Sequence, residues 1–181
     1  MKIQLIGGSG TGKSTLAKYI SEQEHIKWID TDMYLWTDET FTENHPVEIR
    51  KEMYQRDMEQ GEGYVVSGSV FSWNPDGFDN RELLVFLELD ESERLDRLRK
   101  REKQRMKEKE SWLDENGELT NDFIEWCKTY CTANDWNSAG TYAEHLHQME
   151  ISKSPVLKLN SHRPVEELYE EIVNYVKRKA F

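Results

Sequence analysis

A glycine-rich stretch directly after the first apolar run constrains this chain more than any other feature. Residues 3–7 are suited to a buried strand, and residues 13–23 form a helical pattern with Leu16, Ala17 and Ile20 on one face. The stretch between them reads Gly7-Gly8-Ser9-Gly10-Thr11-Gly12-Lys13-Ser14-Thr15, which satisfies G-x-x-x-x-G-K-[ST]. Four glycines let backbone N–H groups converge on an anion, and the helix start adds the positive end of its dipole. The sequence therefore predicts a phosphate-binding loop.

The residue types in this loop indicate which anion it binds. Lys13 can reach the β- and γ-phosphates of a nucleoside triphosphate, and the Ser14 hydroxyl can hold Mg²⁺. The loop alone does not distinguish a kinase from an ATPase or a GTPase. The chain has no Asn-Lys-x-Asp stretch, so a switch-type GTPase is not expected.

Short strand patterns alternate with helical patterns along the whole chain. Five strands separated by helices imply an α/β fold with a parallel sheet covered on both faces, in which ligands bind beyond the carboxyl ends of the strands. The expected strands span residues 3–7, 25–29, 63–67, 83–89 and 155–159. The expected helices span residues 13–23, 46–60, 91–110, 120–132, 138–151 and 164–179.

Composition excludes several classes of partner. The 181 residues carry 24 Lys and Arg against 35 Asp and Glu, a net charge of −11. An acidic surface does not suit nucleic acid or an anionic membrane, so neither is expected as a partner. Two cysteines and the lack of any long apolar stretch favour a cytoplasmic protein. The cations are unevenly placed, since residues 94–109 hold nine Lys and Arg against three acidic residues.

Three further motifs stand at or after the ends of expected strands. Asp30-Thr31-Asp32 ends the second strand, Ser67-Gly68-Ser69 ends the third, and Arg97 and Arg101 lie four apart on the helix after the fourth. With the phosphate loop, these motifs make the whole chain resemble the adenylate-kinase-like and shikimate-kinase-like small P-loop kinases. The resemblance implies a P-loop NTPase three-layer αβα sandwich, strand order 2-3-1-4-5 and a helical lid insertion. It also implies ATP and Mg²⁺ as cofactors.

The resemblance assigns roles to particular residues. Asp30 would lie near the metal with Ser14, and Asp32 would contact the acceptor hydroxyl. Arg97 would stack on adenine, Arg101 would bind phosphate, and Arg105 would be a lid arginine. The loop at residues 160–164, with Ser161 and Arg163, would contact the base through backbone groups. A solvated charged helix remains the alternative for the arginines.

The chain departs from the family pattern at the acceptor. Monophosphate kinases usually carry an Asp before the glycine at Gly68, where this chain has Ser67, and arginines near residues 32–36 and 69–73, where it has none. Gly68 would let the acceptor approach the backbone closely. Tyr34 and Trp73 are expected to line a pocket for an uncharged or aromatic acceptor. Packing of these rings in the core is the alternative.

These observations give one domain with three parts: a core of residues 1–30, 62–105 and 152–181, an acceptor-binding region at 31–61, and a lid at 106–151. Cys127, Cys131, His145 and His147 in the lid loosely resemble zinc-ligand spacing, but cysteines four apart on a helix are more often buried. The expected activity is ATP-dependent phosphotransfer to a small-molecule hydroxyl or phosphate. The alternative is an ATP-binding regulatory module. A monomer or homodimer is expected.

Overall fold

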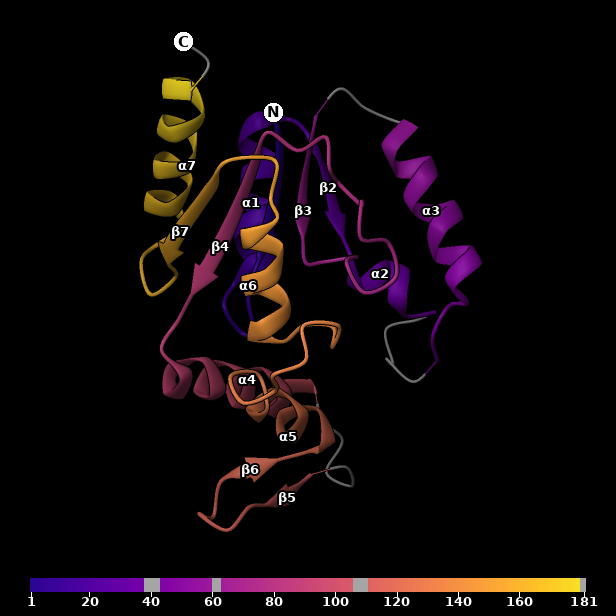
Figure 1. Ribbon diagram of the computed structural model, residues 1–181. Coiled ribbons are helices and arrows are strands. Elements are labelled where there is room, and N and C mark those ends of the chain that lie inside the picture. The colour runs from indigo at the N-terminus through magenta and orange to yellow at the C-terminus, as the bar shows by residue number, and fades with distance from the viewer. Residues whose placement is uncertain (38–42, 60–62, 106–110, 180–181) are drawn as a thin grey trace.

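A five-stranded parallel sheet forms the centre of the molecule (Figure 1). The computed structural model describes residues 1–37, 43–59, 63–105 and 111–179. The strands are β1 (Lys2–Ile6), β2 (Lys27–Asp30), β3 (Tyr64–Ser67), β4 (Leu83–Glu88) and β7 (Val156–Asn160). They lie in the order β2-β3-β1-β4-β7, which is the predicted 2-3-1-4-5 when the sheet strands are counted along the chain. The predicted fold class is confirmed.

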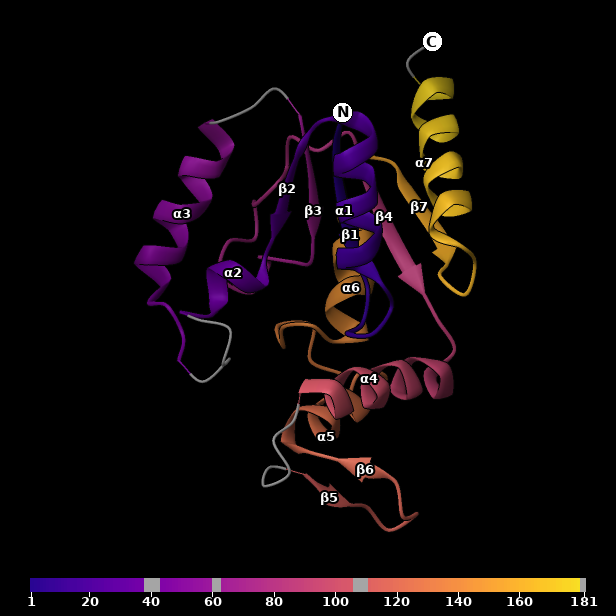
Figure 2. The same cartoon turned by 180° about the vertical axis from the view of Figure 1, so that it is seen from behind.

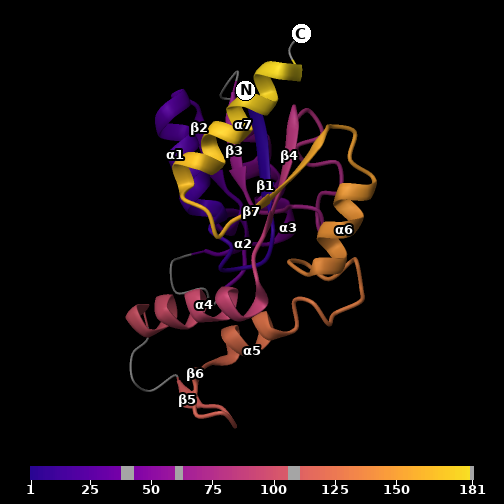
Figure 3. The same ribbon diagram turned by 90° about the vertical axis from the view of Figure 1, so that its left-hand side faces the viewer.

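Helices cover both faces of this sheet. Helices α1 (Lys13–Glu24) and α7 (Val165–Lys179) lie on one face, and α6 (Tyr142–Glu150) lies on the other (Figure 3). Viewed from behind, α1 lies in front of the strands (Figure 2). Among the described residues, no helix combines the length and apolar character that a membrane crossing requires.

Two apolar clusters join the three layers. Ile3 and Leu5 of β1 pack with the buried faces of α1 and α7, whereas Ile6 packs on the α6 side. This alternation follows from the two-residue period of a strand. Strand β4 is buried from Leu83 to Leu87, which explains why its sequence is apolar at successive positions.

The β2 edge of the sheet carries a separate unit. Helices α2 (Asp32–Leu35) and α3 (Val47–Glu59) lie outside β2. The apolar cluster in this part of the molecule includes Ile29, Tyr34 and Phe78, with Tyr54 of α3 packed against it. The short helix α2 was not expected from the sequence, because four residues are too few to show a helical period.

The predicted insertion at residues 106–151 differs from an all-helical lid. Helix α4 (Glu91–Arg105) is followed, after residues outside the described part, by an antiparallel hairpin of β5 (Trp112–Leu113) and β6 (Leu119–Thr120). The predicted extension of the preceding helix to residue 110 lies outside the described residues. The Asp114 carboxylate accepts the N–H groups of Asn116 and Glu118, and Gly117 has a φ of 76°, which together close the turn.

The remaining part of the insertion contains two helices with different positions. Helix α5 (Asp122–Lys128) begins after Asn121, whose side chain accepts the Ile124 N–H at 2.8 Å. It lies with α4 beyond the carboxyl ends of the strands (Figure 1). Helix α6 instead packs Tyr142 and Met149 against the sheet. The division into core, acceptor region and lid remains a prediction.

Candidate active site

The phosphate loop connects the end of β1 to the start of α1, as predicted. Gly7, Gly10 and Gly12 all have positive φ angles, which fold the backbone back on itself. Gly12 occupies the N-cap position, where it has no side chain to occupy the first N–H groups of α1. Ser14 and Thr15 lie exposed in the first turn of that helix. This arrangement leaves helix N–H groups and a hydroxyl available to an anion and its counterion.

Lys13 is held against the first half of the loop. Its Nζ donates to the carbonyl oxygens of Gly7 at 2.8 Å and Gly8 at 3.0 Å. Burial lowers the pKa of this ammonium to about 8, while the negative charges of Asp32 and Asp30 act in the opposite direction. The lysine is therefore protonated at neutral pH and lies within electrostatic range of both carboxylates.

The two carboxylates stand together where β2 ends. The Asp32 N–H donates to Asp30 Oδ1 at 3.2 Å, and the Asp32 side chain is exposed. Burial raises the pKa of the Asp30 carboxyl, and the neighbouring charge of Asp32 raises it further. A cation would stabilise the ionised form of the Asp30 carboxyl, and carboxylate oxygens are donors that Mg²⁺ prefers.

A larger metal cluster is not present in the part of the chain that the structure describes, where no three His, Cys, Asp or Glu side chains gather around a common point. A cation at Asp30 would therefore complete its shell with the Ser14 hydroxyl, phosphate oxygens and water. Cys127 is buried and Cys131 is exposed, and neither forms a disulfide. The loose zinc-like spacing of the sequence is thus not assembled into a site.

The end of β3 lies beside Asp30. Ser67 is in register with Asp30, and its hydroxyl accepts the Trp28 Nε1–H at 3.0 Å. Gly68 has a φ of 111°, and its N–H donates to the Leu5 carbonyl. The backbone therefore turns sharply at the position where the resemblance places the acceptor.

Two of the predicted arginines approach the nucleotide side of the site. Arg97 donates through Nη2 to the Ser161 carbonyl at 3.2 Å, so α4 contacts the loop after β7, and stacking of Arg97 on adenine stays a prediction. The Arg101 guanidinium lies 5.4 Å from the centre of the Phe123 ring, and its charge contributes to lowering the pKa of Lys13. Arg105 ends α4, and its side chain lies outside the described side chains.

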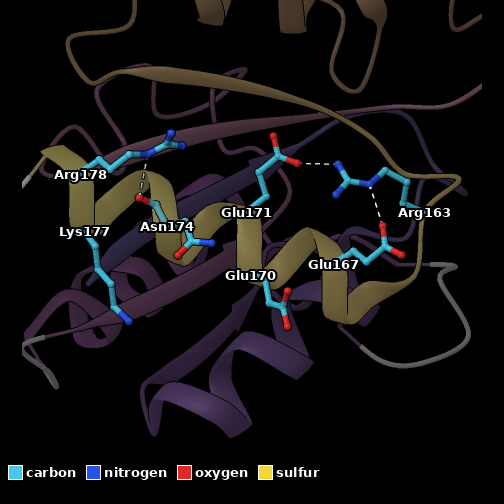
Figure 4. A pocket seen from close by; sticks show the side chains of 7 residues that line it. All are labelled: Arg163, Glu167, Glu170, Glu171, Asn174, Lys177 and Arg178. Atoms are coloured by element: carbon cyan, nitrogen blue, oxygen red, sulfur yellow. Dashed lines mark hydrogen bonds and ion pairs between the residues drawn. The ribbon is translucent and has the colours of Figure 1, made fainter.

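Two residues predicted to bind the nucleotide have side-chain partners within the protein, and their contact with the base stays a prediction. Arg163 lies along α7, where it pairs with Glu167 at 3.2 Å and Glu171 at 2.5 Å (Figure 4). The hollow that these residues line is open to solvent along the helix surface and does not include the phosphate loop. Ser161 is buried, and its hydroxyl donates to the Glu88 carbonyl, which ties the ends of β7 and β4 together.

The predicted acceptor aromatics belong to the apolar cluster beside β2. Tyr34 is 2% exposed, and its hydroxyl donates to Asp57 Oδ2 at 2.6 Å. Trp73 meets it edge to face, with ring centres 6.0 Å apart. The buried Tyr34 ring has no free face for an acceptor, which corrects the expectation for this residue. An aromatic residue near a strand end does not reveal which way its ring turns.

Arg94, Tyr130, Glu144 and His145 are buried near the site. Of these four residues, Arg94 and Glu144 were not selected from the sequence for a role. Burial lowers the pKa of His145 to about 3, so the ring is neutral, and its Nδ1 lies 2.9 Å from the Tyr130 hydroxyl. The spacing of Glu144 and Gln148, four residues apart, was visible in the sequence, but only the structure shows that this helical face is buried.

The fold and the phosphate loop together define a P-loop NTPase fold, and comparison with known proteins gives the family. The family model described as AAA domain matches residues 3–120. The uncharacterized protein YqaC of Bacillus subtilis strain 168 is 31% identical over 174 residues, which cover 96% of each chain. The chain therefore belongs to this AAA domain family.

Solved structures with the same fold include three kinases. A gluconokinase from Sinorhizobium meliloti 1021 matches with a TM-score of 0.59 and 18% identity over 99% of this chain and 93% of its own. Shikimate kinase from Aquifex aeolicus vf5 matches with a TM-score of 0.53 and 17% identity, over 99% of this chain and 98% of its own. Deoxyadenosine kinase from M. mycoides with bound dATP matches with a TM-score of 0.55 and 14% identity, over 98% of this chain and 100% of its own. At these identities the likeness shows a shared fold.

Proposed function

We propose that this protein is an ATP-dependent phosphotransferase that moves the γ-phosphate to the hydroxyl group of a small molecule. The observation that carries the proposal is the position of Lys13 in the phosphate loop, within electrostatic range of Asp30 and Asp32. One carboxylate can serve a counterion while the exposed one orients a hydroxyl. The three structural neighbours are named as kinases of small molecules, which supports the same class of reaction.

In the proposed reaction, the acceptor oxygen forms a bond to the γ-phosphorus as the bond to the β,γ-bridging oxygen breaks. The hydroxyl proton passes to Asp32, and ADP and the phosphorylated acceptor leave. Lys13 and Arg101 offset the negative charge that spreads over the transferring group. Arg105 is proposed to act with them from the end of α4. Mg²⁺, held by Ser14 and Asp30, would neutralise phosphate charge when bound.

The surroundings of the acceptor favour a molecule without a phosphate group. Ser69 and Phe71 follow β3, and Phe71 lies 6.4 Å from Trp136 and 5.6 Å from His147 between ring centres. Trp136 is 46% exposed, so part of this aromatic group remains available to a ligand. The described members of this group, Phe71, Trp136 and His147, include no arginine, so the group suits an uncharged acceptor ring, such as that of a nucleoside, better than a monophosphate.

A regulatory ATP-binding module is the second candidate, and one observation favours it. Ser67 stands where related monophosphate kinases carry a metal-assisting Asp, and its hydroxyl is bound to Trp28. The site thus holds one carboxylate fewer for Mg²⁺. A protein of this kind would bind ATP and change shape with slow hydrolysis or none.

The test is transfer of labelled phosphate from ATP to a panel of nucleosides, nucleotides, sugars and hydroxy acids, with Lys13→Ala and Asp32→Asn measured side by side. For a kinase, Asp32→Asn lowers kcat by about 100-fold or more while nucleotide affinity changes little. Lys13→Ala lowers both. Asp96→Asn is the matched control, because Asp96 is 60% exposed and pairs with Arg99 on α4.

Two results would contradict the kinase proposal. One is phosphate release without a phosphorylated product across the whole panel. The other is full activity of Asp32→Asn together with loss of ATP binding in Lys13→Ala, which is the behaviour expected of a regulatory module.

A further inference from the structure

Arg94 is a fully buried arginine that joins the phosphate loop to α5. Its side chain is 1% exposed. Nη1 donates to the Ser9 carbonyl at 2.8 Å, and Nη2 donates to the Cys127 carbonyl at 2.7 Å. Glu91 on the same helix accepts from Nε at 2.8 Å and Nη2 at 2.6 Å, which neutralises the guanidinium charge. Three separate segments of the chain thus meet on one side chain.

Only arginine can make this set of contacts. Its planar fork presents donors in fixed directions, whereas a lysine ammonium is a single point at the end of a flexible stem. A buried charge is tolerated when its donors are satisfied, and here Nε, Nη1 and Nη2 each donate. The geometry therefore specifies Arg94 itself and not merely a positive charge.

The contact with Ser9 orients the peptide that the loop presents to an anion. A trans peptide is planar, so the Ser9 carbonyl and the Gly10 N–H point in opposite directions. Because Arg94 holds the carbonyl toward α4, the N–H is directed to the other side of the loop. A carbonyl facing a phosphate would repel it, and an N–H would bind it.

Tyr130, two residues beyond α5, contacts the neighbouring part of the loop. A Cβ on Gly8 would lie 3.1 Å from Cζ of the Tyr130 ring, so the ring rests directly on the Gly8 backbone. The Arg94 guanidinium lies 4.9 Å from the centre of the same ring. The Tyr130 hydroxyl, which is carried by this same Cζ, is bonded to the buried His145 of α6, which fixes the ring at the end that lies against Gly8.

We propose that Arg94 and Tyr130 are positioning residues that hold the Gly8–Ser9 part of the phosphate loop in its nucleotide-binding shape. The segment from Asn121 to Tyr130 is then a clamp on the loop, and nucleotide affinity depends on it although it lies more than a hundred residues further along the chain. The proposal rests on the nucleotide site of the proposed function, but it does not depend on phosphate transfer.

The first test compares Arg94→Lys with Arg99→Lys by titration calorimetry with ADP and Mg²⁺. Arg99 lies on the same helix and pairs with Asp96, so its replacement is the matched control. Arg94→Lys is expected to weaken nucleotide binding by about tenfold or more, since it removes charge-assisted hydrogen bonds to two carbonyls. The KM of the acceptor should change less than about twofold. Equal nucleotide affinity in both variants would overturn the proposal.

A second test separates the Tyr130 ring from its hydroxyl. Tyr130→Phe keeps the ring on Gly8 and should retain nucleotide affinity within about threefold, whereas Tyr130→Ala should lose about tenfold or more. Tyr169→Phe is the control, because it removes a hydroxyl bonded to Glu24 on α1. Wild-type affinity in Tyr130→Ala would count against the clamp.

A third measurement uses the wild-type protein, so its outcome does not depend on whether a variant folds. If the clamp strengthens nucleotide binding, nucleotide must strengthen the clamp by the same factor. Hydrogen exchange of the wild-type protein with ADP and Mg²⁺ should therefore slow at amides of residues 121–130, and unchanged exchange there would refute the inference. A protein that binds ADP but transfers no phosphate would refute the proposed function alone, and one that binds no nucleotide would refute both.

Discussion

Replacing Glu144 by glutamine should remove a pH dependence of stability that arises from a single buried carboxyl. Glu144 is 1% exposed on α6. Its carboxyl accepts the Gly140 N–H at 2.5 Å and the Ser69 hydroxyl at 3.2 Å. Burial raises the pKa of this group to about 7, and these two hydrogen bonds offset the rise only in part.

The sign and size of the effect follow from proton linkage. In the unfolded chain the glutamate titrates near its ordinary pKa of 4.5, whereas the folded protein holds the proton to about pH 7. Between these values the folded state binds more protons, so the free energy of unfolding falls as the pH rises. This difference between the folded and unfolded pKa values of Glu144 corresponds to about 3 kcal/mol in the free energy of unfolding. Glutamine resembles the protonated acid and exchanges no proton, so Glu144→Gln should match the wild type at low pH and exceed its stability by about 3 kcal/mol above about pH 7.

The assay is urea unfolding of both proteins, followed by circular dichroism, at intervals from about pH 4.5 to about pH 8. Glu150→Gln is the matched control, since Glu150 is exposed on the same helix and its replacement should shift stability by less than about 0.5 kcal/mol at any pH. A stability difference between Glu144→Gln and the wild type that does not change with pH would refute the reasoning. So would a difference that grows toward low pH.

Four further outcomes are expected. Gly68→Ala should destabilise by about 3 kcal/mol or more in urea unfolding, because its Cβ would lie 2.0 Å from Thr31 Oγ1 at a φ of 111°. Gly117→Ala should lower the free energy of unfolding by only about 1 kcal/mol, because its Cβ would meet no atom within 4 Å and only the φ of 76° is unfavourable. Ile172→Ala removes a fully buried side chain and should cost about 2–5 kcal/mol. Nucleotide affinity, measured by calorimetry, should fall about tenfold per pH unit above about pH 8 as Lys13 loses its proton, and an arginine at this position should remove that fall.

The sheet and the phosphate loop could be predicted because their signals are local. The loop motif is eight consecutive residues, and the sheet strands are short segments rich in apolar residues that end at turn residues. Once the strands were placed, the resemblance gave their order, which the structure confirms. The hairpin of β5 and β6 was missed because two-residue strands show no period.

The site could be predicted only in part, because several of its contacts join distant segments. Arg97 and Arg101 were found by their spacing, but Arg94, on the same helix, is the one that is fully buried. Tyr34 was expected at the acceptor and lies in an apolar cluster, and the Arg163 side chain, expected beside the base, pairs with Glu171 of α7. Sequence spacing gives the face of a helix on which a side chain lies, and the partner on that face depends on tertiary packing.

The central position of β1 has a consequence for the order of events during synthesis. This strand is translated before its two neighbours, which pair with it through Tyr64 of β3 and Leu83 of β4. At about 5–20 residues per second, several seconds pass before either neighbour leaves the ribosome. During that time the apolar run of β1 has no partner strand, and the loop that follows it lacks Arg94. If Arg94 holds the loop as proposed, a nascent chain that ends before residue 94 should bind nucleotide less tightly than the folded protein, and its apolar β1 segment lacks both neighbouring strands.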